Sequence, residues 1–366
     1  MSSTGGDTVN IVLQMVYLFS FLIFMFYGQK FQTWMMLREI EGALVRLRVL
    51  RDEAKKMTVD KVKEFGDKNA DPTPRIDHLL EYFTIMPANL DPAGIVPKID
   101  HLVDTYDKRF KDEVKLLAPV AGESQQENIE GVIGHTLGLN TLYRSVNHFY
   151  LMGKKTMSLY VIMQIQMQLP LVMQMAEAFS ASIKAFAEGQ PIGDGAGALV
   201  AAKLMYGYST LEVAKETVVA RVPFEGRDLI VVKATGPGTT VGKPGEAIQM
   251  LIEQAGGKIV MVIMVDAMGK FEGEKSGETS EGAGAAIGGI GVEQFEIESA
   301  ATKYKIPVHG VTVKESIEES LAPMTKAISD GTNIALARVK RIILEGTKEN
   351  DVVIVAGIGN TVGVGQ

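Results

Sequence analysis

The C-terminal half alternates short apolar runs with stretches of helical periodicity, and this alternation constrains the fold more than any other feature. Four runs rich in Val and Ile are the expected strands, and they lie at residues 228–233, 258–265, 307–313 and 351–356. The expected helices between them lie at 245–256, 292–304 and 315–346. Such alternation is typical of a parallel sheet covered on both faces. The predicted fold class is therefore α/β, with helices on both faces of a C-terminal parallel sheet.

Three of the four expected strands end in glycine-rich segments, at 235–246, 266–291 and 357–366. In folds of this class, ligands bind outside the carboxyl ends of the strands. Glycine lets backbone amides turn toward one point, and a following helix N-terminus favours an anion. The ligand-binding residues predicted on these grounds are Thr235, Gly236, Gly238, Thr239, Thr240, Gly242, Lys243, Gly245, Asp266, Gly284, Gly288, Gly357 and Gly359.

The segment TGPGTTVGKPG has the composition of a phosphate-binding loop but matches no standard nucleotide motif. A Walker A loop requires glycine where Pro237 stands and Ser or Thr where Pro244 stands. The dinucleotide-binding pattern fails because position 241 is Val. We therefore expect a phosphate- or carboxylate-bearing ligand, nucleotide-like or another anionic small molecule, and the cofactor stays unknown.

Candidate catalytic groups are scattered. Lys243, Asp266, Asp194 and His309 form no recognised constellation, so the catalytic residues stay unknown. His309 fits a general base, but a packed strand histidine is the preferred interpretation. The segment 266–291 is either a functional lid or metal-bearing loop or a flexible insertion.

Two segments of the chain are similar in sequence, PRIDHLLEYF at 74–83 and PKIDHLVDTY at 97–106. One interpretation makes His78 and His101 paired metal ligands. The preferred one is two similar helix starts, because Pro and Asp favour the first helical turn. With five His and no Cys in the chain, we predict no metal site.

Residues 11–27 form a 17-residue run without a charge. At about 1.5 Å per residue, such a helix just reaches across a hydrocarbon core. No Lys or Arg precedes the run, and ten lie in residues 30–68. This asymmetry predicts a single-pass protein of the cell membrane, with the lipid bilayer as partner, the N-terminus outside and the bulk of the chain cytoplasmic.

The remaining N-terminal half is expected to be helical. Residues 31–56 carry an apolar stripe that needs a partner in the same chain or in a neighbouring copy. Gly131, Gly134 and Gly138 are spaced to admit a second helix. Residues 156–186, rich in Met and Gln, favour a buried position between layers or between subunits. The predicted divisions are a tail and transmembrane helix (1–28), a charged stalk (29–70), a helical domain (71–188) and the α/β domain (189–366).

Composition excludes several classes of protein. Hydrophobic residues make up 46% of the chain and charged residues 22%, which excludes a disordered chain. The formal net charge of −7 disfavours a nucleic-acid partner. The absence of cysteine excludes disulfides and thiolate chemistry.

The motifs GQPIGDGAG, ATGPGTTVGKPGEA and EGAGAAIGGIGVE, together with the N-terminal apolar run, resemble an uncharacterised archaeal family of membrane-anchored proteins. The resemblance covers the whole chain. It implies an archaeal origin and a membrane location, and it implies no activity, because the family is known only as a domain of unknown function.

Together these features predict a membrane-anchored cytoplasmic scaffold or sensor. It would form homo-oligomers and bind a phosphate-bearing small ligand in the α/β crevice. The alternative is a membrane-anchored enzyme of phosphoryl-transfer or hydrolase type that uses the same crevice.

Overall fold

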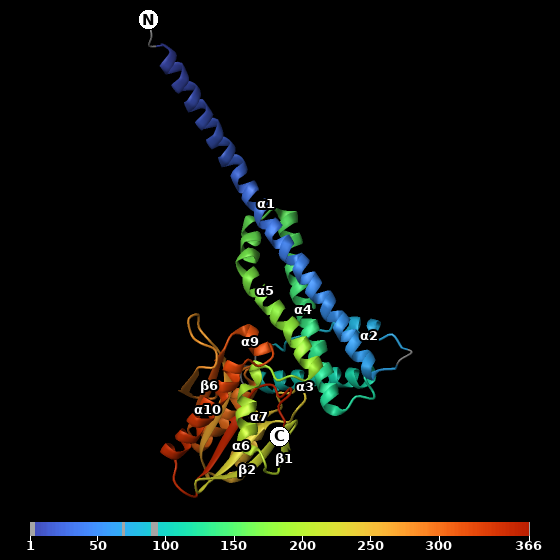
Figure 1. The fold of residues 1–366 in the computed structure, drawn as a ribbon, viewed down its shortest axis with the longest axis vertical. Coiled ribbons are helices and arrows are strands. Elements are labelled where there is room, and N and C mark those ends of the chain that lie inside the picture. The colour runs from blue at the N-terminus through green and yellow to red at the C-terminus, as the bar shows by residue number, and fades with distance from the viewer. Residues whose placement is uncertain (1–3, 68–69, 89–93, 366) are drawn as a thin grey trace.

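The computed structural model describes residues 4–67, 70–88 and 94–365, and Figure 1 shows a helical part followed by a part built around a sheet. Residues 1–3 of the predicted N-terminal tail lie outside the described residues. The helices of the first part are α1 (Thr4–Phe65), α2 (Thr73–Leu79), α3 (Ile95–Leu117), α4 (Glu123–Thr156) and α5 (Leu159–Glu188).

The C-terminal half of α1 packs with α4 and α5 into a long bundle (Figure 1). The expected apolar stripe supplies the contacts, because Ile40, Leu44 and Leu47 are buried in one cluster with residues of α4 and α5. Of the two partners that the sequence left open for this stripe, the structure shows the one in the same chain.

Two glycines of α4 let α5 approach closely. A Cβ at Gly138 would lie 3.0 Å from the ring of Phe179, and one at Gly131 would lie 3.0 Å from the ring of Phe186. The expected close helix contact is therefore present at these two positions. Gly134 has no atom within 4 Å of such a Cβ and takes no part.

The segment rich in Met and Gln forms α5, which is covered on one face. Ile162 and Leu169 are buried in the bundle, whereas Tyr160 is 70% exposed and Met167 is 78% exposed. An apolar face of α5 therefore remains at the surface of the chain.

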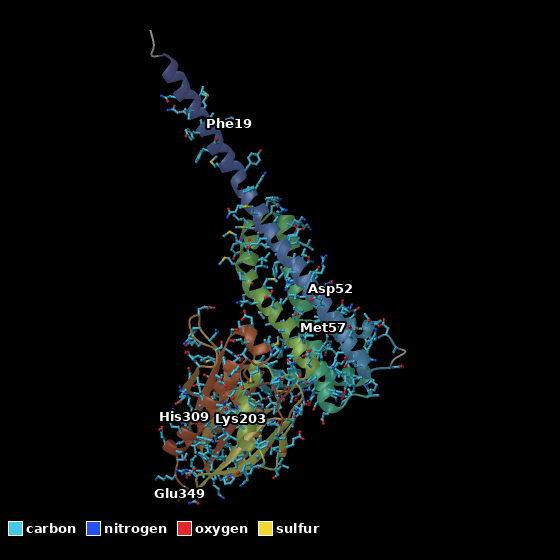
Figure 2. The ribbon with its side chains drawn as sticks, viewed as in Figure 1. Phe19, Asp52, Met57, Lys203, His309 and Glu349 are labelled. Atoms are coloured by element: carbon cyan, nitrogen blue, oxygen red, sulfur yellow. The ribbon has the colours of Figure 1, made fainter. Side chains whose placement is uncertain are left out.

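The predicted transmembrane helix is wrong. Among the described residues, no helix is long and apolar enough to cross a membrane. The uncharged run of 17 residues stands at the lower limit of the length of a span, about 17–25 residues. It is instead the first part of the 62-residue helix α1, where Figure 2 labels Phe19. The single-pass membrane location and the N-terminus-outside topology that followed from it are wrong as well.

The second part begins with η1 (Gly193–Gly195). Its helices are α6 (Ala196–Met205), α7 (Pro244–Ala255), α8 (Val292–Tyr304), α9 (Ile317–Leu321) and α10 (Lys326–Gly346). Its strands are β1 (Leu211–Ala214), β2 (Thr217–Phe224), β3 (Arg227–Ala234), β4 (Ile259–Gly269), β5 (Thr279–Ala283), β6 (Val308–Glu315) and β7 (Val352–Gly357).

The strands form one sheet in the order β1-β2-β3-β7-β4-β6-β5. The four expected strands correspond to β3, β4, β6 and β7, which run parallel in the centre. The sheet as a whole is mixed rather than parallel, because β1, β2 and β5 pair antiparallel at its edges. A tight turn at Glu225 and Gly226, both with positive φ, joins β2 to β3 and forces the antiparallel direction.

Helices cover both faces of this sheet. Neighbouring strand residues point to opposite faces, so Val231 packs toward α6 and α10 while Val232 packs toward α7 and α8. This arrangement explains why the central strands are apolar without alternation.

The glycine-rich segment 266–291 is more ordered than a long loop. β4 continues to Gly269, and β5 pairs with β6 through residues such as Glu281 and Val311. The intervening turn is held by the ion pair of Lys314 with Glu274 and by the Gly277 amide, which donates to the Lys314 carbonyl at 2.8 Å. Ser, Glu and Gly have low strand propensity, which is why the sequence did not indicate β5.

Leu47→Ala tests the bundle. Leu47 is fully buried, so we expect the free energy of unfolding to fall by about 2–5 kcal/mol in urea denaturation. Val45 lies two residues away and is 59% exposed, so Val45→Ala should change it by less than about 0.5 kcal/mol. Equal effects of the two substitutions would contradict the packing described.

Candidate functional site

A cavity of about 510 Å³ lies outside the carboxyl ends of β4 and β7. Its floor includes Asp266 and Gly359, which follow the apolar parts of these strands, and Asp194 of η1. The N-terminal ends of α7 and α8 form one wall, and residues of α3 form another. We call this cavity the crevice. It joins the sheet part to the helical part at the edge where α/β proteins bind ligands.

The floor of the crevice carries two carboxyl groups in close electrostatic contact. Asp266 is 8% exposed and accepts hydrogen bonds from the amides of Ala267, at 2.8 Å, and Gly288. Burial, and then the charge of Asp194, raises the pKa of Asp266 to about 8. The Asp194 carboxylate accepts a hydrogen bond from the Asn360 amide at 2.9 Å, and burial raises its pKa as well.

Gly359 makes this arrangement possible. Its φ is +113°, and a Cβ there would lie 1.9 Å from the carbonyl oxygen of Asp194. Only glycine therefore allows the β7 loop to lie against η1. The close approach places the residue after Gly359, Asn360, where its amide reaches the Asp194 carboxylate.

A third carboxyl group lies behind the crevice. Glu315 ends β6, is 2% exposed, and neither carboxylate oxygen has a hydrogen-bond partner among the described residues. Burial, and then the charge of Asp194, raises its pKa to about 9. Glu315 was not among the residues predicted from the sequence. The signal was the strand alternation, because Val311, Val313 and Glu315 share one face.

Lys243 borders the crevice immediately before α7, and it is paired with α3. Its ammonium nitrogen lies 2.7 Å from Asp100 Oδ1 and 3.3 Å from Asp104 Oδ1. Burial alone would lower the pKa of Lys243, but the hydrogen bond and charge of Asp100 outweigh it and raise the pKa. The lysine is therefore fully charged at neutral pH.

The N-terminus of α7 is also in contact with a carboxylate. The Gly245 amide, in the first turn of α7, donates a hydrogen bond to the carboxylate of Glu293 in α8. Burial raises the pKa of Glu293, and the Gly245 amide and Lys243 oppose that rise. The ammonium of Lys243 and the amide of Gly245 thus form a pair of donors that bind carboxylate oxygens, those of Asp100 and Glu293 respectively.

Five of the thirteen predicted ligand-binding residues line the crevice, and they are Gly242, Lys243, Asp266, Gly288 and Gly359. The other eight predicted residues do not line the crevice. The Thr239 hydroxyl donates to Asn128 at 2.8 Å, and the Thr240 hydroxyl donates to Glu216 at 2.6 Å. The Thr235 amide donates to the Glu216 carbonyl at 2.8 Å.

The remaining predicted glycines serve close backbone packing or a turn. Cβ atoms on them would lie 2.0 Å from the Val364 carbonyl (Gly236), 1.6 Å from the Glu127 carboxylate (Gly238), 2.6 Å from the Glu293 carboxylate (Gly245) and 2.3 Å from the Gly197 carbonyl (Gly357). Gly284 follows β5 with a φ of +110°. The loop at 235–243 therefore contacts α4 and the β1–β2 turn, and its role in ligand binding stays a prediction.

The histidine candidates lie apart from the crevice. His309 is on β6, in register with Ile263 and Ala283, and Figure 2 labels it in the sheet part. The two similar segments, 74–83 and 97–106, have different partners, because Asp77 pairs with Lys55 whereas Asp100 pairs with Lys243. Within residues 4–67, 70–88 and 94–365, no three His, Asp or Glu side chains are grouped so as to hold a metal ion.

Comparison with protein families covers nearly the whole chain. Residues 14–189 match the N-terminal domain of a protein of unknown function, DUF1512, and residues 192–365 match the C-terminal domain of DUF1512. The chain belongs to the DUF1512 family. The two matches meet between α5 and η1, so the crevice contains residues of both DUF1512 domains. The chain matches no curated protein and no solved structure.

Because of the buried carboxyl groups, we expect the protein to become less stable as pH rises. The folded protein binds protons more tightly than the unfolded chain, because Asp266 and Glu315 have raised pKa values of about 8 and about 9. The free energy of unfolding should therefore fall as pH rises from about 5 to about 9. Glu315→Gln should reduce that fall and stabilise the protein at pH 8, measured by urea denaturation.

Glu349→Gln, at the exposed turn before β7 that Figure 2 labels, is the matched control and should leave the pH profile unchanged. A wild-type profile that rises over this range would contradict the assignment. An unchanged slope in Glu315→Gln would show that Glu315 is not among the groups responsible.

Proposed function

We propose that this protein binds a phosphate-bearing small molecule in the crevice and acts as a ligand-responsive scaffold rather than as a catalyst. The observation that best supports this proposal is the pair of hydrogen-bond donors at α7, the Lys243 ammonium and the Gly245 amide. Both donors contact carboxylate oxygens of the protein itself, from Asp100 and Glu293. Donors that bind one oxyanion also have the charge and geometry to bind another. The N-terminus of a helix adds an electrostatic potential that favours an anion.

The remainder of the crevice suits the rest of such a ligand. The volume of about 510 Å³ lies within the range of about 300–1,000 Å³ found for small-molecule sites. Val103, Ile287, Ile290 and Ile358 supply apolar wall, which fits a ring or other non-polar group. This combination supports a nucleotide-like compound, with its phosphate at α7 and its apolar part against these side chains.

Lys243→Ala tests the donor pair. Loss of a hydrogen bond to a charged group should weaken the binding of inorganic pyrophosphate by about 1.5–3 kcal/mol, as measured by calorimetry. Lys348→Ala removes the same charge at an exposed position and should leave affinity unchanged. Pyrophosphate that binds Lys243→Ala as tightly as it binds Lys348→Ala would refute this site.

The scaffold part of the proposal rests on self-association. An apolar face of α5 is exposed, with Tyr160 at 70%, Met163 at 40% and Met167 at 78%. Large exposed apolar faces of this kind mark contact surfaces.

The archaeal origin implied by the glycine motifs stays a prediction.

Met167→Glu should lower the molar mass measured by light scattering at micromolar concentration, because it places a charge on the proposed contact face. Glu177→Gln, also on α5 and in a loose exposed pair with Arg46, is the control and should leave the mass unchanged. A monomeric wild-type protein would refute self-association.

One observation favours the alternative of a phosphoryl-transfer enzyme or hydrolase. Asp266, with its pKa raised to about 8 beside Asp194, has the proton affinity of a general acid or base near neutral pH. Release of phosphate over time from pyrophosphate or a nucleotide, and its loss in Asp266→Asn, would support the enzyme. Binding without turnover supports the scaffold.

A further inference from the structure

Two carboxyl groups of α3, those of Asp100 and Asp107, line the crevice, and that of Asp104 lies on the same side of the helix. Asp100, Asp104 and Asp107 are spaced by four and three residues, which places them on one side of a helix. Asp100 and Asp104 contact Lys243, at 2.7 and 3.3 Å. Lys215, in the β1–β2 turn, lies 3.4 Å from Asp104 and 4.0 Å from Asp107. The crevice side of α3 is therefore held to the sheet part by ion pairs.

The two halves of α3 are held in different ways. Phe110, Val114 and Leu117 are buried with Ile129 and Ile133 of α4, so the C-terminal half is anchored by an apolar cluster. The N-terminal half carries the ion pairs to Lys243 and Lys215. The side chains of Asp100 and Asp104 are 36% and 45% exposed, whereas that of Lys243 is 13% exposed. Water reaches the two aspartates, which reduces what these pairs contribute to stability.

A phosphate at Lys243 could not share the lysine with both aspartates. Asp100 and Asp104 already contact its ammonium group, and the charge of Glu293 acts on it from farther away. Adding a phosphate would place two carboxylates and an oxyanion within contact distance of a single positive charge. Like charges at such distances repel, so the aspartates and the phosphate compete for Lys243.

We infer that α3 is an autoinhibitory segment, in which Asp100 and Asp104 occupy Lys243 and must be displaced when a phosphate-bearing ligand enters the crevice. This inference rests on the proposed function. It makes the N-terminal half of α3 the element that responds to the ligand. Because binding couplings are reciprocal, removing the two carboxylates strengthens phosphate binding, and phosphate releases α3 from the sheet part.

The first test is calorimetry with inorganic pyrophosphate on the full chain. The variant Asp100→Asn/Asp104→Asn keeps the side-chain shape and removes both charges. It should bind pyrophosphate more tightly than the wild type, on the order of tenfold. The control Asp52→Asn/Asp112→Asn removes the same charge at exposed positions on α1 and α3 and should bind like the wild type; Figure 2 labels Asp52. Adding Lys243→Met to the first variant should abolish its gain.

The second test measures the movement of α3 directly. The chain has no cysteine, so Thr105→Cys and Ser299→Cys place spin labels at two sites only, both exposed, on α3 and α8. Pyrophosphate should lengthen or broaden the distance distribution between the labels, and it should leave it unchanged when Lys243→Met is added. Circular dichroism checks that each variant is folded.

The outcomes separate the two proposals. Equal pyrophosphate affinity in the wild type and in Asp100→Asn/Asp104→Asn overturns autoinhibition and leaves the ligand site standing. An equal gain in the control variant also overturns it, because the effect is then one of overall charge. Pyrophosphate that binds none of these proteins refutes the ligand site, and the autoinhibition with it.

Discussion

The rest of the structure depends on the parallel pairing of β7 with both β3 and β4. The last strand of the chain enters the centre of the sheet, with Val355 in register with Val231 on one side and Ile263 on the other. Parallel neighbours require crossover connections, and these bring α7, α8 and α10 onto the two faces. All the central strands therefore end at the same edge. That edge gathers Lys243, Asp266 and Gly359, which are far apart in the sequence, around one crevice.

The electrostatics of this edge are dominated by carboxyl groups. Burial raises the pKa values of Asp194, Asp266 and Glu315 because it disfavours their charged forms, and the charge of Asp194 adds to the rise for Asp266 and Glu315. Lys243 differs, because α3 supplies two carboxylates that hold its charge. The helical part thus completes the site and does not merely support it. In the function proposed above, the contact between the two parts and the contact with a ligand use the same lysine.

The helical part shows that an apolar stretch of sequence is buried only where neighbouring helices pack against it. In α1, the stripe containing Ile40, Leu44 and Leu47 is buried by α4 and α5. Earlier in the same helix, Phe19 is 70% exposed, and Figure 1 shows that α1 extends there beyond its neighbours. Local hydropathy predicted a membrane span at 11–27, but no helix among the described residues is long and apolar enough to cross a membrane. The apolar run is one part of the longer helix α1.

The sequence alone determined the elements that depend on local periodicity. Val and Ile runs located β3, β4, β6 and β7, and glycine spacing predicted the close contact of α4 with a second helix at Gly131 and Gly138. It also pointed to Lys243 and Asp266, because both follow an apolar strand. The tertiary structure decided what depends on contacts between distant residues. The antiparallel edges β1, β2 and β5, the burial of Glu315, and the pairing of Lys243 with Asp100 each join segments that no local pattern connects. Periodicity records which face of an element is apolar, whereas the partner of a charged side chain is set by the path of the whole chain.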